Sequence, residues 1–199
     1  MRLAVLLSGR GSNFAAIHGA IVAGVLDATI EAVICNRPEA PGLALARELG
    51  LNAHGVDHRA FPTRGAHETE VLRLLAEARP ELVVLAGYMR LLSPAFVAAY
   101  RHRILNIHPS LLPAFPGVDA QAQAVAYGVK VSGCTVHLVD EDLDAGPIVL
   151  QRVVPLLDGD DAKSLGARIL EHEHEAYVEA LVKLSRGSWR VEGRRVVFS

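Results

Sequence analysis

Short apolar runs alternate with helical patterns through the first half of the chain. Continuous apolar runs predict buried parallel strands at residues 3–7, 30–35, 82–86 and 103–108, with a shorter strand at 53–56. Apolar residues at helical spacing, together with Gly, Pro and Ser-Pro boundaries, predict helices at 14–25, 41–49 and 71–78 and one starting at Ser93-Pro94. This alternation is typical of an α/β fold: a mostly parallel central sheet with helices on both faces.

The second half of the chain follows a different pattern. Residues 131–139 and 148–154 are β-rich runs joined by the acidic segment 140–147, and they predict an antiparallel pair. A long helix is expected at 163–184, and a hairpin at 189–198 that turns at Glu192-Gly193. No repeat or linker interrupts the sequence, so we expect one domain, residues 1–199.

Composition excludes several classes of protein. The 199 residues carry 20 basic and 22 acidic side chains, a net charge of −2, and 51% are hydrophobic, which argues against disorder and against a nucleic-acid partner. The longest apolar stretch, residues 82–89, is far shorter than the ~20 residues of a membrane span. Two cysteines, Cys35 and Cys134, lie in apolar runs and are expected to be buried free thiols. These features predict a cytoplasmic protein with no membrane partner.

Residues 9–13, the glycine loop, stand between the first strand and the first helix. Gly9 and Gly11 allow a ligand to approach the backbone, and a helix N-terminus presents free N–H groups to an anion. A dinucleotide loop would have a third glycine where Phe14 stands, and a P-loop would have a lysine. The loop therefore predicts a phosphate site of another kind, and the alternative is a tight turn in which Ser12 or Asn13 caps the helix.

A second pattern lies at the end of the strand at 103–108. Asn106 and His108 are two residues apart, so both side chains project to one side of the strand. An amide that stabilises an oxyanion beside an imidazole that moves a proton suits a reaction at a carbonyl. The acidic segment offers a carboxylate partner, and spacing alone does not choose among its four acids: Asp140, Glu141, Asp142 and Asp144. The alternatives are a strand-end histidine bonded to the backbone and solvated loop acids.

Four motifs together resemble one enzyme family. They are the runs Leu6–Asn13 (LLSGRGSN), Leu85–Ser93 (LAGYMRLLS), Asn106–Pro113 (NIHPSLLP) and Gly133–His137 (GCTVH) leading to Asp144-x-Gly146-Pro147. With these motifs the chain resembles the phosphoribosylglycinamide formyltransferases, folate-dependent enzymes of purine synthesis, over nearly its whole length. The third motif with the later Asp is typical of formyl transfer from folate, and the first narrows the resemblance to the glycinamide ribonucleotide branch.

The resemblance implies a Rossmann-like formyltransferase fold in which residues 1–100 bind the nucleotide phosphate and residues 101–199 carry catalysis and folate binding. It implies transfer of the formyl group of 10-formyltetrahydrofolate, the co-substrate, to the amine of 5'-phosphoribosylglycinamide, by direct attack and without metal. The catalytic residues it implies are Asn106, His108 and Asp144, with the first two stabilising the oxyanion and the last two handling the proton. The implied ribonucleotide contacts are Gly11, Ser12, Asn13 and Glu173. The implied folate contacts are Arg64, Met89, Arg90, Leu91, Leu92, Asn106 and Asp140.

Other interpretations remain open. A related formyltransferase with a different amine acceptor shares the catalytic residues, and a non-catalytic nucleotide- or folate-binding module shares the fold. The sequence allows a homodimer. The run Glu171–Glu175 alternates Glu and His, and residues two apart on a helix do not converge on one metal ion, so no metal site is expected there. We expect His54, His58 and His67 to be solvated in a polar loop. Relatives commonly have a histidine within residues 117–123 and an aromatic residue at Leu138, and this chain has neither.

Overall fold

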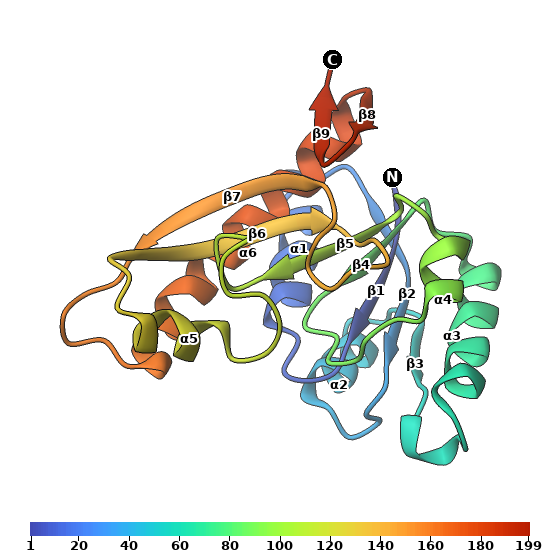
Figure 1. The fold of residues 1–199 in the computed structure, drawn as a ribbon. Helices are drawn as coiled ribbons and strands as arrows, with labels where there is room; N and C mark the ends of the chain where they lie inside the picture. Colours follow the sequence, from blue (N-terminus) through green and yellow to red (C-terminus); the bar gives the residue numbers. More distant parts are fainter. The chain divides into compact units, whose positions relative to one another are not determined.

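A computed structural model describes residues 1–199, and the chain divides into two compact units, Met1–Leu105 and Asn106–Ser199. Figure 1 shows the elements of both units along the chain.

The first unit contains four parallel strands in the order β3-β2-β1-β4. Their bounds are β1 (Arg2–Leu7), β2 (Thr29–Cys35), β3 (Ala53–Gly55) and β4 (Leu82–Leu85). Leu3 to Leu7 are fully buried, as expected of a central strand covered on both faces. Strand β5 (Ile104–His108) begins at the end of this unit and continues into the second.

Helices connect these strands. They are α1 (Ser12–Val22), α2 (Pro41–Glu48), α3 (Arg64–Ala78) and α4 (Pro94–Ala99), with a 3-10 turn η1 (His58–Ala60) before α3. The chain moves outward from β1 to β3 and then crosses back to β4. Right-handed crossovers therefore place α1 and α2 on one face and α3 on the other, and Figure 1 shows α3 and α4 together on one side of the strands.

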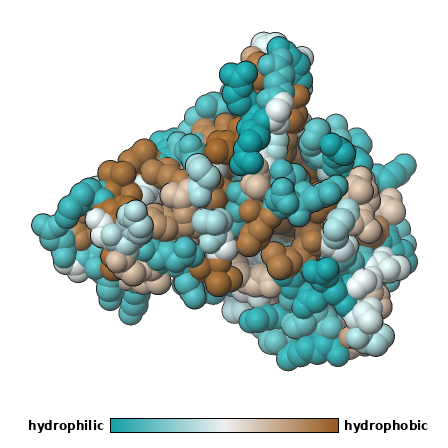
Figure 2. All heavy atoms as spheres, in the orientation of Figure 1, coloured by the Kyte–Doolittle hydropathy of each residue, from teal (hydrophilic) through white to brown (hydrophobic).

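The second unit is built around an antiparallel pair, β6 (Val131–Leu138) and β7 (Ile148–Pro155), with Val131 opposite Pro155. Helix α6 (Ala162–Arg186) packs against both strands and against α5 (Ala120–Tyr127). A C-terminal hairpin of β8 (Trp189–Glu192) and β9 (Arg195–Phe198) completes the strand order β6-β7-β9-β8. Strand β9 pairs with β7 at Ile148 alone, and Figure 2 shows hydrophobic surface along β7, where Val153 is 62% exposed.

The predicted α/β fold is confirmed, including the antiparallel pair and the C-terminal hairpin. Three details differ. Helix α1 ends at Val22, because Gly24 at φ 70° follows, and Val25 is half exposed instead of lying on the helix face. Helix α3 begins at Arg64, where the Thr63 hydroxyl accepts a hydrogen bond from the Ala66 N–H. Helix α5 was not predicted, because its sequence AQAQAVAY has no clear apolar stripe.

Two predictions about side chains have opposite outcomes. Cys35 and Cys134 are free and fully buried, as predicted, and burial raises the pKa of Cys134 to about 12. The prediction of a solvated His67 is wrong. This residue lies on α3, is fully buried, and its Nε2 is 3.1 Å from the Val56 carbonyl oxygen. The polar residues around it in sequence concealed one inward-facing helix position.

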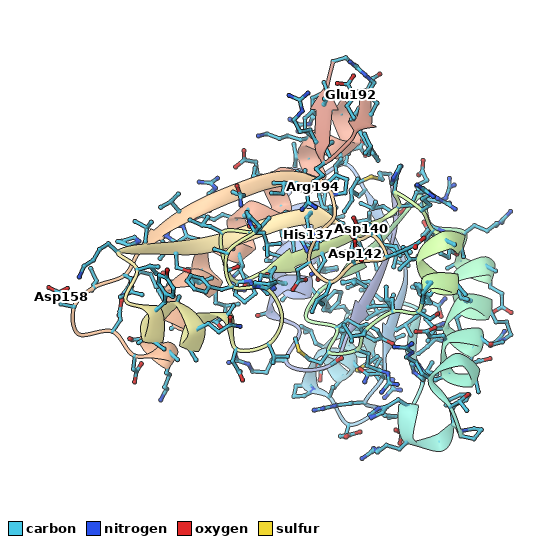
Figure 3. All side chains as sticks on the ribbon, in the orientation of Figure 1. His137, Asp140, Asp142, Asp158, Glu192 and Arg194 are labelled. Atoms are coloured by element: carbon cyan, nitrogen blue, oxygen red, sulfur yellow. The ribbon has the colours of Figure 1, made fainter.

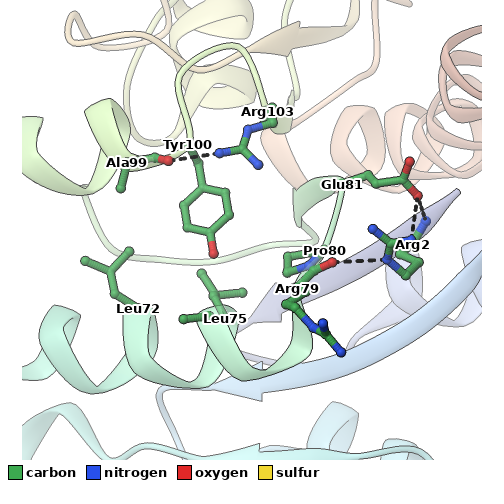
Figure 4. Close-up of a pocket in the computed structure, with 10 residues that line it drawn as sticks. Arg2, Leu72, Leu75, Arg79, Pro80, Glu81, Ala99, Tyr100 and Arg103 are labelled. Carbon is green, nitrogen blue, oxygen red and sulfur yellow. Dashed lines mark hydrogen bonds and ion pairs between the residues drawn. The ribbon is translucent and has the colours of Figure 1, made fainter.

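A cleft of about 660 Å³ lies at the amino ends of β1 and β4, shown in Figure 4. Its polar lining residues bond to one another. Arg2 donates from its backbone N–H to Glu81 (2.8 Å) and from Nε to the Arg79 carbonyl (3.2 Å), and the Arg103 guanidinium stacks 4.9 Å from the Tyr100 ring. These contacts tie the strand starts together, at the opposite end of β1 from the glycine loop.

No helix in the structure combines the length and the apolar character required to cross a membrane.

Candidate active site

The glycine loop follows β1 directly and leads into α1. Gly11 is the helix N-cap, with the left-handed φ of 76°, and no side chain caps the helix. The alternative of a turn capped by Ser12 or Asn13 is therefore wrong. The backbone N–H groups of Arg10, Gly11 and Ser12 donate no hydrogen bond within the protein. Unsatisfied N–H groups at a helix N-terminus suit an anion such as phosphate.

Ser8, the residue before the glycine loop, ties it to the predicted folate segment. The Ser8 N–H donates to the Gly87 carbonyl (3.1 Å), and the Ser8 hydroxyl accepts from the Met89 N–H (2.8 Å). The same hydroxyl donates to Asn36 Oδ1 at 2.5 Å, and Ser8 is 2% exposed. Three strands of the first unit, β1, β2 and β4, are thus linked at their carboxyl ends. Sequence reasoning treated Ser8 only as part of a motif.

In the second unit, β5 and the loop after β6 bring His108 and Asp144 together. His108 Nδ1 is 3.4 Å from Asp144 Oδ2, and both side chains are more than nine-tenths buried. His108 Nε2 is 2.9 Å from the Phe115 carbonyl, which can only accept, so Nε2 carries a hydrogen. Nδ1 faces the Asp144 carboxylate. Asp144 also accepts from the Gly117 N–H at 2.8 Å.

A second imidazole, His137 on β6, joins this group. His137 Nδ1 is 3.0 Å from the Leu138 carbonyl and carries the hydrogen, so Nε2 accepts from Asn106 Nδ2 at 3.2 Å. Burial lowers the pKa of His137 and keeps this ring neutral at pH 7. Its unprotonated Nε2 lies 3.8 Å from Asp144 Oδ1 and forms no ion pair there. Asn106, His108, His137 and Asp144 are called the His108 cluster below.

The loop that carries Asp144 is closed by Gly146. A Cβ on Gly146 would lie 1.8 Å from the Leu138 carbonyl oxygen, so only glycine fits. Beside it, the Leu138 N–H donates to the Pro147 carbonyl at 2.8 Å. Asp144 is the acid of this loop that faces His108, whereas Asp140 accepts locally from the Asp142 N–H at 3.2 Å. Figure 3 labels Asp140 and Asp142 in this loop and His137 on β6.

The segment after His108 is anchored by Thr135 on β6. The Thr135 hydroxyl donates to the Ser110 carbonyl (2.7 Å) and accepts from the Leu112 N–H (3.0 Å). Gln151 Nε2 on β7 donates to the same hydroxyl and to the Leu112 carbonyl, each at 2.9 Å. These two residues fix the backbone that leaves β5 and hence the position of His108. Sequence reasoning missed both, because single polar residues in apolar strands give no pattern.

The remaining predicted contacts lie in four places. Arg64 is exposed at the first position of α3, and Asp140 is half-buried in the loop after β6. Met89 and Leu91 are 72% and 63% exposed, so apolar surface is available for a flat ring, and the neighbouring Arg90 and Leu92 are half-buried. Glu173 is buried on α6. Nowhere in residues 1–199 do three His, Cys, Asp or Glu side chains gather as a metal site would require.

One unit with parallel strands and a glycine loop of unsatisfied backbone N–H groups, together with a second unit that carries an Asn, His and Asp group suited to carbonyl chemistry, is typical of formyl-transfer proteins. The chain belongs to the formyl transferase family, whose sequence model matches residues 1–181. The family resemblance predicted from the four motifs is confirmed.

Individual relatives carry more specific names. The chain is 41% identical over 194 residues to the phosphoribosylglycinamide formyltransferase of Escherichia coli, covering 98% of this chain and 89% of that protein. It is 46% identical to the "Trifunctional purine biosynthetic protein adenosine-3" of Drosophila pseudoobscura pseudoobscura, covering 95% of this chain but only 14% of that protein's length. The solved structure of glycinamide ribonucleotide transformylase 1 from Symbiobacterium toebii superposes with a TM-score of 0.96 at 46% identity, covering 100% of this chain and 93% of that one.

Proposed function

We propose that this protein transfers the formyl group of 10-formyltetrahydrofolate to the amine of 5'-phosphoribosylglycinamide, giving formylglycinamide ribonucleotide and tetrahydrofolate in purine biosynthesis. The observation that carries the proposal is the buried His108–Asp144 pair with Asn106 on the same strand. The names of the relatives supply the acceptor and the formyl group that is transferred, and the resemblance to the family supplies the folate donor.

The substrate amine attacks the formyl carbon directly, with no enzyme nucleophile. His108 Nδ1 is directed at Asp144, so Nε2 is the nitrogen that serves the reaction. The developing oxyanion takes the place of the Phe115 carbonyl as the acceptor of the Nε2 hydrogen. The Asn106 amide is the second donor, oriented by its contact with the neutral His137.

Protons are handled by His108 and Asp144 together. The attacking amine loses a proton and the leaving folate nitrogen gains one, and the pair offers an imidazolium donor and a carboxylate acceptor. The Gly117 N–H fixes one oxygen of the carboxylate during this exchange.

Each unit supplies some of the proposed substrate contacts. In the first unit, Gly11, Ser12 and Asn13 hold the ribonucleotide phosphate through the N-terminus of α1. Arg64 and residues 89–92 contact the folate, with Met89 and Leu91 supplying exposed apolar surface. In the second unit, Glu173 contacts the ribose hydroxyls, and Asn106 and Asp140 contact the folate.

An acceptor panel tests the proposal. Purified protein is mixed with formyl-folate and, in separate arms, with phosphoribosylglycinamide, a methionyl-tRNA, a sugar-nucleotide amine or no acceptor, and the folate absorbance is followed. Product in the first arm alone is expected. Product with another amine would favour a related formyltransferase, and no product in any arm would favour a binding module.

Three finer predictions belong with this proposal: a cytoplasmic location, no nucleic-acid partner and a homodimer. Light scattering over a range of protein concentrations measures the oligomeric state, and a constant monomer mass would reject the homodimer.

A further inference from the structure

The backbone of α2 lies directly against the glycine loop. Gly42, the second residue of α2, is buried, and its N–H donates to the Gly9 carbonyl at 3.0 Å. A Cβ on Gly42 would lie 2.9 Å from that carbonyl oxygen and 3.1 Å from both N and Cα of Gly11. A Cβ on Gly11 would in turn lie 2.9 Å from the Gly42 Cα. All of these neighbours are backbone atoms, which cannot rotate away as a side chain can.

This contact sets the orientation of the loop. The peptide joining Gly9 to Arg10 is planar and trans, so its C=O and its N–H point in opposite directions. Because the Gly9 carbonyl is held by the Gly42 N–H, the Arg10 N–H is turned away from α2. Like the N–H groups of Gly11 and Ser12, the Arg10 N–H has no acceptor in the protein.

A side chain at position 42 would displace the loop and leave the helix in place. Helix α2 is anchored by Leu43 and Ala46, which are fully buried, and Pro41 fixes its first turn. Gly9 and Arg10 are exposed and have no such anchor. To make room for an added Cβ, the backbone of the loop would therefore move away from α2 by a few tenths of an ångström.

We propose that Gly42 is a positioning residue for the phosphate subsite: by lacking a side chain, it lets α2 set the orientation of the N–H groups that bind the ribonucleotide. This inference rests on the phosphate role given to the glycine loop in the proposed function. Gly42 lies outside the four motifs, in a helix 31 residues after Gly11, and the inference adds it to the residues that phosphate binding requires.

Gly42→Ala tests the proposal, with Gly19→Ala as its matched control. Gly19 lies within α1 and has nothing within 4 Å of its Cβ position, so the same methyl group there should change nothing in the loop. For Gly42→Ala we expect the KM for phosphoribosylglycinamide to rise about tenfold or more, with kcat and the KM for formyl-folate little changed. Inorganic phosphate should raise the Tm of the wild type and of Gly19→Ala more than that of Gly42→Ala.

The outcomes separate this inference from the proposed function. If wild type transfers formyl groups and Gly42→Ala keeps the wild-type KM and phosphate shift, the inference is wrong and the function stands. If wild type transfers nothing, the function fails, and the phosphate shifts of the three proteins still decide the role of Gly42. Equal rises in both KM values would also overturn the inference.

A measurement on the wild type covers the case in which Gly42→Ala does not fold. Hydrogen exchange is followed with and without phosphoribosylglycinamide. Ligand held by the loop should slow exchange of the Gly42 amide, which is bonded to Gly9, and leave the last turn of α2 unchanged. No change at Gly42, or equal slowing along the whole of α2, would contradict the proposal.

Discussion

The glycine loop and the His108 cluster are built by opposite means. The loop in the first unit consists of backbone N–H groups, and its geometry depends on side chains that are absent at Gly11 and Gly42. The cluster in the second unit consists of four buried or half-buried side chains, each oriented by a hydrogen bond or a charge. A backbone site binds an anion without needing a protonation state, whereas the cluster can change its protonation during a reaction. Damage to the loop should therefore appear in substrate binding, and damage to the cluster in turnover.

The largest effect is expected in the cluster. His108→Ala removes the proposed proton donor, and Asp144→Asn removes the carboxylate that faces His108 Nδ1. Either change should lower kcat by about 10²- to 10⁴-fold, with a far smaller effect on the ribonucleotide KM. Steady-state kinetics measure both values, and a thermal melt checks that the variants fold. Turnover near the wild-type value in either folded variant would remove these residues from the mechanism.

The next effect is expected in the loop. Gly11→Val adds a side chain where φ is 76° and where its Cβ would meet the Gly42 Cα at 2.9 Å. The ribonucleotide KM should rise by about tenfold or more, and the formyl-folate KM should rise much less. Isothermal titration with each substrate separates the two affinities. Equal losses for both substrates would mean that the loop does not bind the phosphate.

A smaller effect is expected at Thr135, which anchors the backbone segment after His108. Thr135→Val keeps the shape of the side chain and removes the hydroxyl shared by Ser110, Leu112 and Gln151. Buried groups left without partners should lower the free energy of unfolding by about 1–3 kcal/mol. We expect kcat to fall modestly, because His108 loses part of its backbone anchor. Urea unfolding supplies the first value, and an unchanged midpoint would show that this network contributes nothing.

The smallest effect concerns pH and lies outside both regions. Burial lowers the pKa of His67 below its ordinary 6.5, so the unfolded chain binds a proton more readily than the folded one. Stability from this residue is present above about pH 6.5 and is lost as pH falls through the folded-state pKa. Urea unfolding at several pH values should show a shallower acid loss for His67→Gln than for wild type. Identical curves would contradict this account of His67.

Much of the fold could be predicted from local pattern. Leu3 to Leu7 form a fully buried strand where a continuous apolar run predicted one, and the Ser93 hydroxyl caps α4 by accepting from the Phe96 N–H. These features depend on neighbours in sequence. Helix α5 was missed because its alanines and glutamines carry little periodicity, and its position depends on packing against α6.

A smaller part of the site than of the fold could be predicted from the sequence. The same-side placement of Asn106 and His108 follows from strand geometry, but spacing left four acids open, and only the fold of the 139–147 loop directs Asp144 at His108. His137, Thr135 and Gln151 act through contacts with distant parts of the chain. Gly42 is informative only once α2 lies against the loop. Residues that position other residues are therefore the part of a site that sequence alone conceals.

In the proposed reaction the formyl carbon passes from the folate to the substrate amine. Formyl-folate labelled with carbon-13 in the formyl group, mixed with phosphoribosylglycinamide and the protein, can be followed by carbon NMR. We predict that the folate signal is replaced by a formamide signal on the glycinamide nitrogen, with wild-type protein and not with His108→Ala. Appearance of free formate in place of the formamide, or the same spectrum with His108→Ala, would contradict the account.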